Sequence, residues 1–283
     1  MSSPASTTAA KRRAFRQLHA SGCFVIPNPW DAGSARFLQG LGFQALATTS
    51  SGMAWSHGHP DGRASLEAVL AHLREIVVAT DLPVNADFES GHAADAAGVA
   101  ESVRRAIETG IAGLSIEDAS GDAAEPLREI GAAALRIRAA RGAIDAAGGD
   151  TLLVARAENF LLGRPDLDDT IARLRAYAQA GADCLYAPGI QTREQIAAVV
   201  AAVAPKPVNL LVGAAGELTL AEIAALGVRR VSVGGALART AWGAFMRSAR
   251  LIAEQGRFDG FAHAASGAEL NAFFGRDPAP PPL

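Results

Sequence analysis

Residues 108–116 read "ETGIAGLSI": the end of a helical pattern, a glycine and the beginning of an apolar run. The same order recurs as "QAGADCLYA" at residues 179–187 and as "ALGVRRVSV" at residues 225–233. Glycine after the last turn of a helix readily adopts the left-handed conformation of a C-cap. The stretch therefore predicts a helix followed closely by a strand, and its recurrence predicts that this unit repeats along the chain.

Beyond these three stretches, short apolar runs alternate with longer Ala/Leu/Arg-rich patterns over most of the sequence. We expect strands at residues 24–26, 45–48, 84–87, 113–117, 152–156, 184–187, 208–211 and 230–233. We expect helices at residues 32–41, 65–80, 94–109, 130–147, 167–180, 193–202, 220–226 and 236–255. Eight such units predict an α/β fold, a (β/α)8 TIM-type barrel of roughly 250 residues. A doubly wound open sheet is the alternative.

No linker divides the sequence, so residues 1–283 are interpreted as one barrel domain whose core covers about residues 22–256. A further helix is expected before the first strand, at residues 9–21, and another after the last unit, at residues 266–273. Residues 257–283 then comprise this C-terminal helix and a Pro-rich tail, "RDPAPPPL", which we expect to be disordered. Because an apolar helix beyond a completed barrel needs a surface to pack on, it predicts a homo-oligomer.

The composition narrows the class of protein. Hydrophobic residues make up 49% of the chain and the net charge is −3, so we expect a large core and no nucleic-acid partner. No run approaches the roughly 18 apolar residues of a membrane span, and the N-terminus lacks the apolar region of a secretory signal. Cys23 and Cys184 lie in apolar runs and are expected to be buried thiols. We therefore expect a cytoplasmic protein with no membrane partner. The basic cluster at residues 11–13 is expected on the solvated face of a first helix.

Acidic side chains follow two neighbouring strands of the expected barrel. The stretch "LPVNADFESG" (residues 82–91) places Asp87 and Glu89 two residues apart, and "LSIEDASG" (residues 114–121) ends its apolar run at Glu117. In a barrel the carboxyl ends of the strands converge on one face, which carries the active site. Three carboxylates there suit a hard divalent cation such as Mg²⁺, which prefers oxygen ligands. The alternative is that each acid caps a helix or pairs with an arginine.

Other strand ends carry groups suited to a carboxylic acid. Arg156 closes an apolar strand, where a charge is costly unless paired, and it suits either a substrate carboxylate or a salt bridge to Glu158 or Glu117. The stretch "TTSSG" (residues 48–52) offers hydroxyl and N–H groups at the start of an expected loop. That loop is long for a barrel connection and includes Asp61, a candidate either for capping the next helix or for reaching the site.

Five stretches at these strand ends resemble the isocitrate lyase/phosphoenolpyruvate mutase superfamily, in that superfamily's order. They are "NPWDAGSARF" (28–37), "ATTSSGMAWSHGHPDG" (47–62), "PVNADFESG" (83–91), "GLSIEDASG" (113–121) and "ARAENF" (155–160), and the similarity covers roughly residues 12–255. The resemblance implies a barrel that depends on Mg²⁺, with Mn²⁺ as a substitute, and that forms an enolate of a small 2-oxo acid. It also implies a dimer or a tetramer whose subunits exchange the C-terminal helix.

The resemblance also implies roles for single residues of this sequence. It implies that Asp87 and Glu117 bind the metal, with Glu89 beside them. It implies that Ser50, Ser51 and Gly52 bind the substrate carboxylate. Arg156 would bind a carboxylate or the leaving group, and Asn209 would be a further polar contact. Asp61 corresponds to an acid beside the substrate, so Asp61 and Arg156 are the expected catalytic residues.

The loop after Glu117 departs from the superfamily's pattern. Lyases that act on isocitrate or methylisocitrate carry a cysteine proton donor there, and phosphonopyruvate enzymes carry a lysine, whereas this loop reads "EDASGDAAEPLREIG" (residues 117–131). We interpret the protein as a Mg²⁺-dependent lyase that cleaves a C–C bond of a small 2-oxo or 2-hydroxy carboxylic acid, by retro-aldol cleavage or decarboxylation. One alternative is a P–C bond mutase or hydrolase. Others are a phosphate-ester enzyme, suggested by "LVGAAG" (211–216) and "SVGGALAR" (232–239), and a non-catalytic carboxylate-binding protein.

Overall fold

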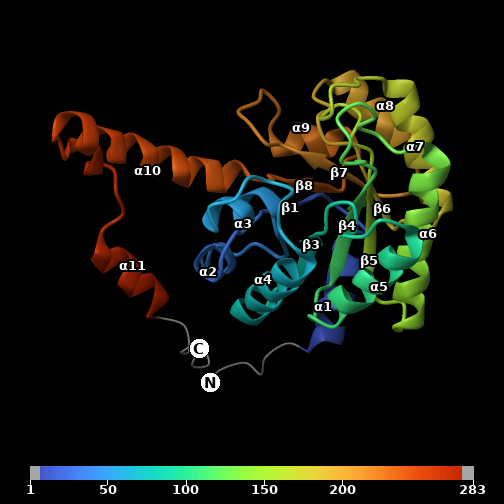
Figure 1. Cartoon of the computed structure of the whole chain (residues 1–283), viewed down its shortest axis with the longest axis horizontal. Helices are drawn as coiled ribbons and strands as arrows, with labels where there is room; N and C mark the ends of the chain where they lie inside the picture. Colours follow the sequence, from blue (N-terminus) through green and yellow to red (C-terminus); the bar gives the residue numbers. More distant parts are fainter. Residues whose placement is uncertain (1–6, 276–283) are drawn as a thin grey trace.

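The computed structural model describes residues 7–275 and shows eight strands alternating with helices (Figure 1). The strands are β1 (Phe24–Ile26), β2 (Leu46–Ala47), β3 (Val84–Asp87), β4 (Gly113–Glu117), β5 (Leu152–Arg156), β6 (Cys184–Tyr186), β7 (Val208–Leu211) and β8 (Arg230–Ser232). The barrel helices are α2 (Ala32–Gly40), α3 (Ser50–Ser56), α4 (Leu66–Ala79), α5 (Ala96–Ile107), α6 (Ile130–Ala146), α7 (Leu167–Gln179), α8 (Arg193–Val203), α9 (Leu220–Ala225) and α10 (Ala236–Gln255). Before and after them lie α1 (Thr8–Leu18), the short helix η1 (Asp259–Phe261) and α11 (Gly267–Phe274).

The strands form one parallel sheet that almost closes on itself. From β2 to β8 each strand pairs with its neighbour in sequence, and β8 pairs with β1. The ends of β1 and β2 are joined by a hydrogen bond from the Ala47 amide to the Pro27 carbonyl, 3.0 Å long. The predicted (β/α)8 barrel is therefore confirmed, and the doubly wound open sheet is wrong.

Most element bounds agree with the sequence analysis to within one or two residues, but the segment after β2 differs. Residues 50–56, expected to be loop, form α3, whose first turn is capped by the Thr49 side chain. The strand expected at residues 45–48 is consequently shortened to Leu46–Ala47. The helix expected at residues 9–21 also ends earlier, at Leu18.

Helix α1 closes the amino-terminal end of the barrel, with Phe15 fully buried against Gly113 of β4. Its basic cluster was expected on a solvated face, and that expectation is wrong for Lys11 and Arg12, which are both buried. The Lys11 ammonium donates to the Thr80 carbonyl (2.6 Å) beyond the end of α4. The Arg12 guanidinium donates to the carbonyls of Ile107 and Ile111 (3.0 and 2.9 Å), at and beyond the end of α5. Cations at these helix ends satisfy carbonyls that have no partner within the helix.

The buried imidazole of His19, just after α1, predicts acid sensitivity. Its Nδ1 lies 2.8 Å from the Phe15 carbonyl, its ring packs edge-on against Phe15 and Phe24, and burial lowers its pKa to about 3. The unfolded chain therefore takes up a proton near pH 6.5, whereas the folded protein resists protonation until about pH 3. Stability is thus present above pH 6.5 and is lost as the pH falls, by about 3 kcal/mol at pH 4.5 from this group.

Thermal unfolding of the protein and of His19→Phe at pH 7.5 and pH 4.5 measures this loss. We expect His19→Phe to reduce the difference between the two pH values. The exposed His57 supplies the control, since His57→Gln is expected to leave the difference unchanged. An equal loss of stability in His19→Phe and in the unaltered protein would contradict the assignment.

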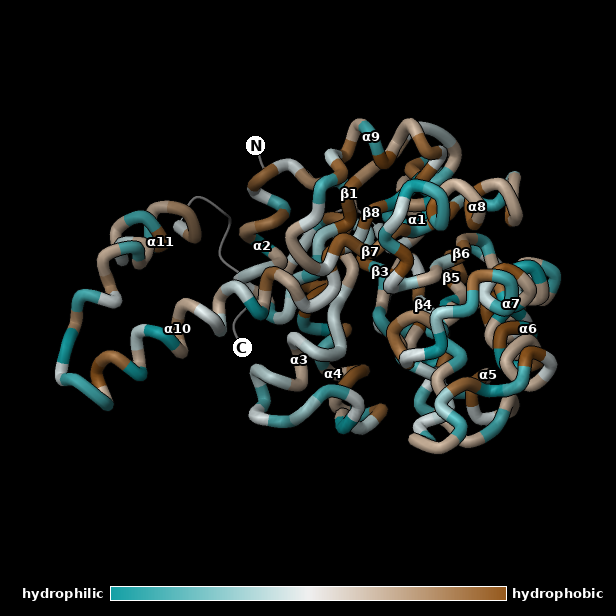
Figure 2. The backbone as a smooth tube through the Cα atoms, turned by 90° about the horizontal axis from the view of Figure 1, so that it is seen from above, coloured by the Kyte–Doolittle hydropathy of each residue, from teal (hydrophilic) through white to brown (hydrophobic). Residues whose placement is uncertain are grey.

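Helices α10 and α11 form an arm that leads away from the barrel and turns back (Figures 1 and 2). The end of α11 packs on α2: the rings of Phe273 and Phe37 lie 4.9 Å apart, and the Phe274 carbonyl accepts a hydrogen bond from Arg36 (3.1 Å). Other apolar side chains of the arm, including Phe245 and Phe258, are exposed. The predicted C-terminal helix is therefore present, at residues 267–274, while the predicted disordered tail lies outside the described residues.

Two further expectations concern the described residues. Both cysteines are free; Cys184 is buried as expected, and Cys23 is only partly buried. Within residues 7–275, no helix is both long enough and apolar enough to cross a membrane.

Candidate active site

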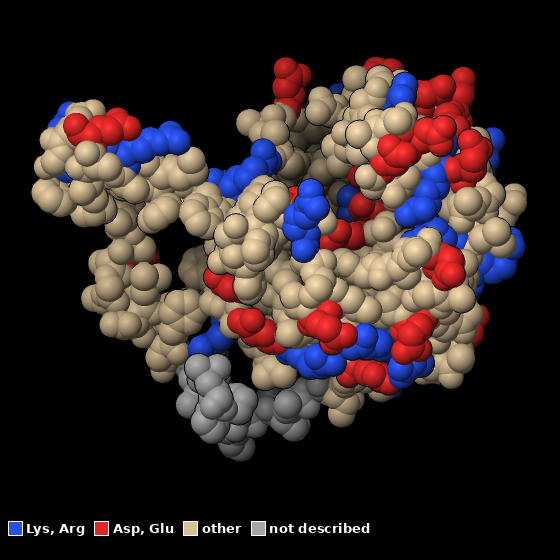
Figure 3. Space-filling model, viewed as in Figure 1, with Lys and Arg blue, Asp and Glu red and all other residues tan. Residues whose placement is uncertain are grey.

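The site residues expected at the strand ends come together at the carboxyl ends of β3, β4 and β5. These three strands are adjacent in the sheet, and their register pairs Asp87 with Ser115 and Glu117 with Arg156. Asp87, Glu117 and Arg156 are each the last residue of their strand, where the chain leaves the sheet. The space-filling view shows acidic and basic atoms next to one another in the hollow above the barrel (Figure 3).

The Arg156 guanidinium binds three carboxylates at once. Its Nη1 lies 2.7 Å from Asp87 Oδ1, its Nη2 lies 3.2 Å from Glu117 Oε2, and its Nε donates to Glu158 Oε1 over 2.9 Å. The side chain is 13% exposed, and although burial lowers its pKa, the three acids raise it well above the ordinary value. The salt-bridge alternative considered for Arg156 is therefore present, with Asp87 as a third partner.

The N-terminus of α3 borders this ion-pair cluster. The Ser50 amide donates to Asp87 Oδ2 over 3.0 Å, so that Asp87 connects the helix to Arg156. The Ser51 hydroxyl lies 3.0 Å from the Thr49 hydroxyl. A Cβ at Gly52 would lie 2.7 Å from the Thr49 side chain and 2.9 Å from that of Trp30, so this position requires glycine. The predicted substrate-binding stretch thus forms a helix start, where amide groups favour an anion.

Glu89 lies in a strained segment beside the cluster. Its φ is +46° and that of His92 is +50°, both in the left-handed region that non-glycine residues rarely adopt. The Glu89 carbonyl accepts a hydrogen bond from the Glu117 amide (2.9 Å), which joins this segment to the end of β4. Glu89 Oε1 is buried and makes no hydrogen bond among the described residues, and His92 Nε2 lies 3.9 Å from it. Backbone strain and a buried oxygen without a hydrogen bond, both at Glu89, indicate a functional rather than a packing role.

The site holds more negative than positive charge. Burial, with the neighbouring charges of Asp87 and Asp61, raises the pKa of Glu89 to about 7. Burial also raises the pKa of Glu117 well above its ordinary value, although the Arg156 charge acts in the opposite direction. This arrangement suits a hard divalent cation, because it offers carboxylate oxygens, excess negative charge and a Glu89 oxygen that makes no hydrogen bond.

The described side chains do not form a preassembled metal site, since no group of three His, Cys, Asp or Glu within residues 7–275 is arranged to hold an ion. The ion pairs of Arg156 with Asp87 and Glu117 account for this arrangement. The residues therefore fit a divalent cation in their chemistry, and Asp87, Glu89 and Glu117 remain the predicted ligands.

Asp61 approaches the site from the loop after α3. Its carboxylate is hydrogen-bonded by the side chain of Ser50 and by the Gly62 amide (3.0 Å). Much of the residue is exposed, yet partial burial of the carboxyl raises its pKa more than the Ser50 hydrogen bond lowers it, and the Asp87 charge adds to the rise. The structure thus places Asp61 next to Ser50.

Asn209 does not reach the open face of the site. Its side chain is fully buried inside the barrel, where Oδ1 accepts from Arg230 (2.7 Å) and Nδ2 donates to Ser232 (2.9 Å). Both ends of the amide are thus occupied by protein groups. The prediction that Asn209 contacts substrate finds no support in this geometry.

The sequence analysis missed two features of the site. The Tyr186 ring lies under the Arg156 guanidinium, 5.1 Å from its central carbon, yet a tyrosine inside "CLYA" looks like an ordinary core residue. Asp118, next to Glu117, points the other way and is 2% exposed. It accepts hydrogen bonds from Tyr177 (2.6 Å) and from the Glu158 amide (2.9 Å), and thereby holds the end of β5 in place. The alternation of side chains along a strand was the available signal for Asp118.

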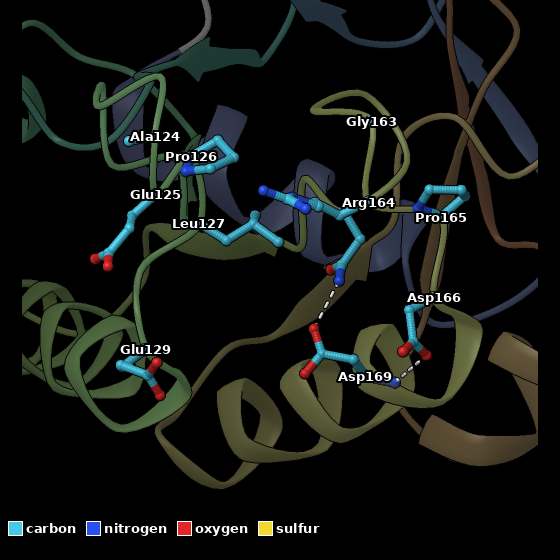
Figure 4. A pocket seen from close by; sticks show the side chains of 11 residues that line it. Ala124, Glu125, Pro126, Leu127, Glu129, Gly163, Arg164, Pro165, Asp166 and Asp169 are labelled. Carbon is cyan, nitrogen blue, oxygen red and sulfur yellow. Dashed lines mark hydrogen bonds between the residues drawn. The ribbon is translucent and has the colours of Figure 1, made fainter.

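The loop after β4 is folded on itself. Ala119 and Leu127 form an antiparallel bridge, and the Arg128 amide donates to the Asp118 carbonyl (2.9 Å). Beside this loop lies a cavity of about 620 Å³, bounded on the other side by the loop after β5. Figure 4 shows Leu127 and Arg164 facing each other across it, with Glu125 turned away from it. This loop supplies no cysteine, lysine or histidine.

Comparison with known proteins places this geometry in a family. The family model for phosphoenolpyruvate phosphomutase matches residues 15–253. A crystal structure described as a lyase/mutase from Burkholderia cenocepacia J2315 is 51% identical, covers 95% of this chain and 97% of its own, and superposes with a TM-score of 0.91. Oxaloacetate decarboxylase from Bradyrhizobium sp. (strain ORS 278) is 32% identical over 79% of this chain and 77% of its own. The structure of oxaloacetate acetylhydrolase with its product oxalate is 28% identical, covers 94% of each chain and has a TM-score of 0.82.

Proposed function

Because the chain belongs to the phosphoenolpyruvate phosphomutase family, part of the isocitrate lyase/phosphoenolpyruvate mutase superfamily of lyases and mutases, we propose that it is a lyase. We propose further that it depends on Mg²⁺ and cleaves a C–C bond of a small 2-oxo or 2-hydroxy carboxylic acid. The observation that carries the proposal is the Arg156 cluster, one guanidinium among three strand-end carboxylates beside a helix N-terminus. Similarity to oxaloacetate decarboxylase supports the choice of bond.

The proposed reaction needs a bound carboxylate and a place for charge on the oxygen at C2. In a 2-oxo acid with a carboxylate on C3, breaking the C3–C4 bond releases CO₂ and sends the electron pair toward the C2 oxygen, which leaves an enolate that takes up a proton at C3. In a 2-hydroxy acid, the hydroxyl loses its proton, the C2–C3 bond breaks to give a C2 carbonyl, and the electron pair moves toward a carboxylate on C3. Mg²⁺ held by Asp87, Glu117 and Glu89 would supply Lewis-acid stabilisation of the developing charge. The amides at Ser50–Gly52 and the Arg156 guanidinium would hold the substrate carboxylate in one orientation, which lowers the entropic part of the barrier.

Asp61 is the group we propose for proton transfer. Its raised pKa brings its protonated form closer to neutral pH, and its hydrogen bond to Ser50 places it next to the proposed carboxylate site. A general acid or base is most effective when its pKa lies near the operating pH. With this residue in place, decarboxylation needs no cysteine in the loop after β4.

Calorimetry of the metal-free protein with Mg²⁺ and then oxalate tests the proposal, since oxalate resembles the planar enolate of a 2-oxo acid. We expect oxalate to bind at least ~10-fold more tightly when Mg²⁺ is present, and oxaloacetate to be decarboxylated in a Mg²⁺-dependent assay. Glyoxylate-forming and acetate-forming cleavage of related acids are measured in parallel to identify the substrate. Oxalate binding that is independent of Mg²⁺, or no binding at all, would count against an enolate site.

A second candidate is a P–C bond mutase or hydrolase. The matched family model, which is that of phosphoenolpyruvate phosphomutase, favours it. A phosphoryl group in transfer carries charge that requires cationic support, and the loop after β4 supplies no lysine. Turnover of phosphonopyruvate in the same assay, without turnover of any oxo acid, would make this the function.

We propose that the protein is a homo-oligomer, a dimer or a tetramer, in which the arm of α10 and α11 is exchanged between subunits. The exposed apolar side chains of the arm, such as Phe245 and Phe258, support this proposal because such groups are usually covered by a partner. Deletion of residues 257–283 is expected to reduce the mass of the particle in light scattering. An unchanged mass after the deletion would speak against exchange of the arm.

A further inference from the structure

Arg230 is a buried cation inside the barrel that makes no ion pair with the part of the chain the structure describes. The residue lies on β8 and is 2% exposed. Its Nε donates to Asn209 Oδ1 over 2.7 Å, and its Nη1 lies 3.4 Å from Asn85 Oδ1. Within residues 7–275, no carboxylate lies within ion-pair distance of it, and burial lowers its pKa. Burying an unpaired charge is costly, so its presence indicates a role beyond filling the barrel.

The hydrogen bonds of Arg230 continue toward the active site. Asn209 on β7 donates from Nδ2 to the Ser232 hydroxyl on β8 over 2.9 Å. Ser232 acts in turn on the side chain of Tyr186 on β6, whose register partner on β7 is Asn209. The Tyr186 ring lies under the Arg156 guanidinium, 5.1 Å from its central carbon. Five buried or half-buried side chains therefore connect the barrel interior to the residue that binds the site's carboxylates.

The chemistry of a guanidinium sets the direction of this chain. Arginine only donates hydrogen bonds, so the group of Asn209 that faces Arg230 has to be the amide oxygen. The amide nitrogen of Asn209 then has to face Ser232, whose oxygen accepts. The Ser232 hydrogen is left free to donate to the Tyr186 oxygen. Without Arg230, the Asn209 amide is free to rotate by 180°, and this order is lost.

We propose that Arg230 is a positioning residue, which orders the Asn209–Ser232–Tyr186 chain and so holds the Tyr186 ring beneath Arg156. The ring gives the guanidinium a flat surface below, while the three carboxylates hold it at its edges. Arg230 touches none of the proposed substrate-binding groups. Its effect on catalysis rests on the function proposed above, whereas its effect on Tyr186 does not.

NMR of protein labelled with ¹³C at tyrosine Cζ tests the proposal, because this resonance responds to hydrogen bonding of the phenol. The chain contains two tyrosines, and Tyr177, which donates to Asp118, serves as the internal control. We expect Arg230→Met and Ser232→Ala each to shift the Tyr186 resonance and to leave that of Tyr177 in place. Arg230→Lys, which keeps a donor toward Asn209, is expected to restore part of the original shift.

The activity measurement is kept separate from the NMR measurement. If the protein turns over a 2-oxo acid, we expect Arg230→Met to weaken Mg²⁺-dependent oxalate binding by about tenfold, and the double variant with Ser232→Ala to be no weaker than either single variant. If the protein turns over no such acid, the proposed function fails while the Tyr186 shift still decides this proposal.

Two results would overturn the positioning role. One is an unshifted Tyr186 resonance in folded Arg230→Met. The other is a common shift of both tyrosine resonances, which would indicate general loosening of the barrel. Should Arg230→Met fail to fold, Arg230→Lys decides instead, because it keeps the buried charge while changing the donor toward Asn209: a partial shift of Tyr186 alone is expected, and an unshifted Tyr186 would overturn the role.

Discussion

Replacing Arg156 with lysine is expected to lower kcat/KM at least ~100-fold on whichever 2-oxo or 2-hydroxy acid the protein cleaves. The guanidinium reaches Asp87, Glu117 and Glu158 through three different nitrogens, at 2.7, 3.2 and 2.9 Å. A lysine ammonium is a compact point charge and does not reproduce this fork. It keeps the positive charge among the acids, so we expect Arg156→Lys to fold.

Steady-state kinetics and calorimetry with oxalate measure the effect of Arg156→Lys. The matched control is Arg164→Lys, an exposed position in the loop after β5 that makes no contact with the three acids. Arg156→Met removes the charge as well and is expected to lose about 3–5 kcal/mol of stability, unless the acids take up protons. Activity of Arg156→Lys within threefold of the unaltered protein would mean that Arg156 holds the barrel together and does not bind substrate.

Asp87→Asn is expected to weaken Mg²⁺ binding by at least ~10- to 100-fold, because it removes the charge of a predicted ligand while keeping its shape. Asp87 also accepts the Ser50 amide and pairs with Arg156, so its replacement changes the anion site too. Glu117→Gln removes a second predicted ligand without touching the Ser50 contact. Weakened binding in both variants would therefore identify the metal site independently of the anion site.

Thermal unfolding with and without Mg²⁺ reports on the metal without any assay of activity. A ligand present at 100 times its dissociation constant stabilises the folded state by about 2.7 kcal/mol, and we expect Asp87→Asn and Glu117→Gln to lose this gain. The exposed Asp122, in the loop after β4, supplies the control variant Asp122→Asn. Full Mg²⁺-dependent stabilisation in both ligand variants would remove Asp87 and Glu117 from the metal site.

The barrel was predictable because its signals are local. The glycine at the end of several helical patterns and the apolar run that follows it recur along the chain, and the strands lie within one or two residues of their expected places. The start of α3 was missed because "TTSSG" has the composition of a loop, and the Thr49 cap becomes visible only in the structure. The basic cluster of α1 was misplaced for a related reason, since the carbonyls that bind Lys11 and Arg12 belong to segments roughly 70 and 100 residues away.

The convergence of the strand-end side chains was predictable from the sequence, but their individual contacts were not. Asp87, Glu117 and Arg156 end three adjacent strands, and a barrel of known strand order brings such residues together. Three features depend on how loops and neighbouring strands pack. They are the opposite directions of Glu117 and Asp118, the backbone strain at Glu89 and the position of Tyr186 under Arg156. Asn209 differs from these residues, since the resemblance implied a polar site contact for it and its partners in the structure lie inside the barrel.

The amino-acid sequence by itself determined the alternation of helices and strands, the number of barrel units and the acids and arginine at the strand ends. Each of these depends on periodicity and on residue types that are close together in the chain. Only the tertiary structure decided which partner each polar group takes: three carboxylates for Arg156, two amide oxygens for Arg230, and no hydrogen bond for one oxygen of Glu89 among the described residues. The physical reason is that burial makes each polar group depend on atoms brought close by the fold, and sequence spacing does not encode those distances.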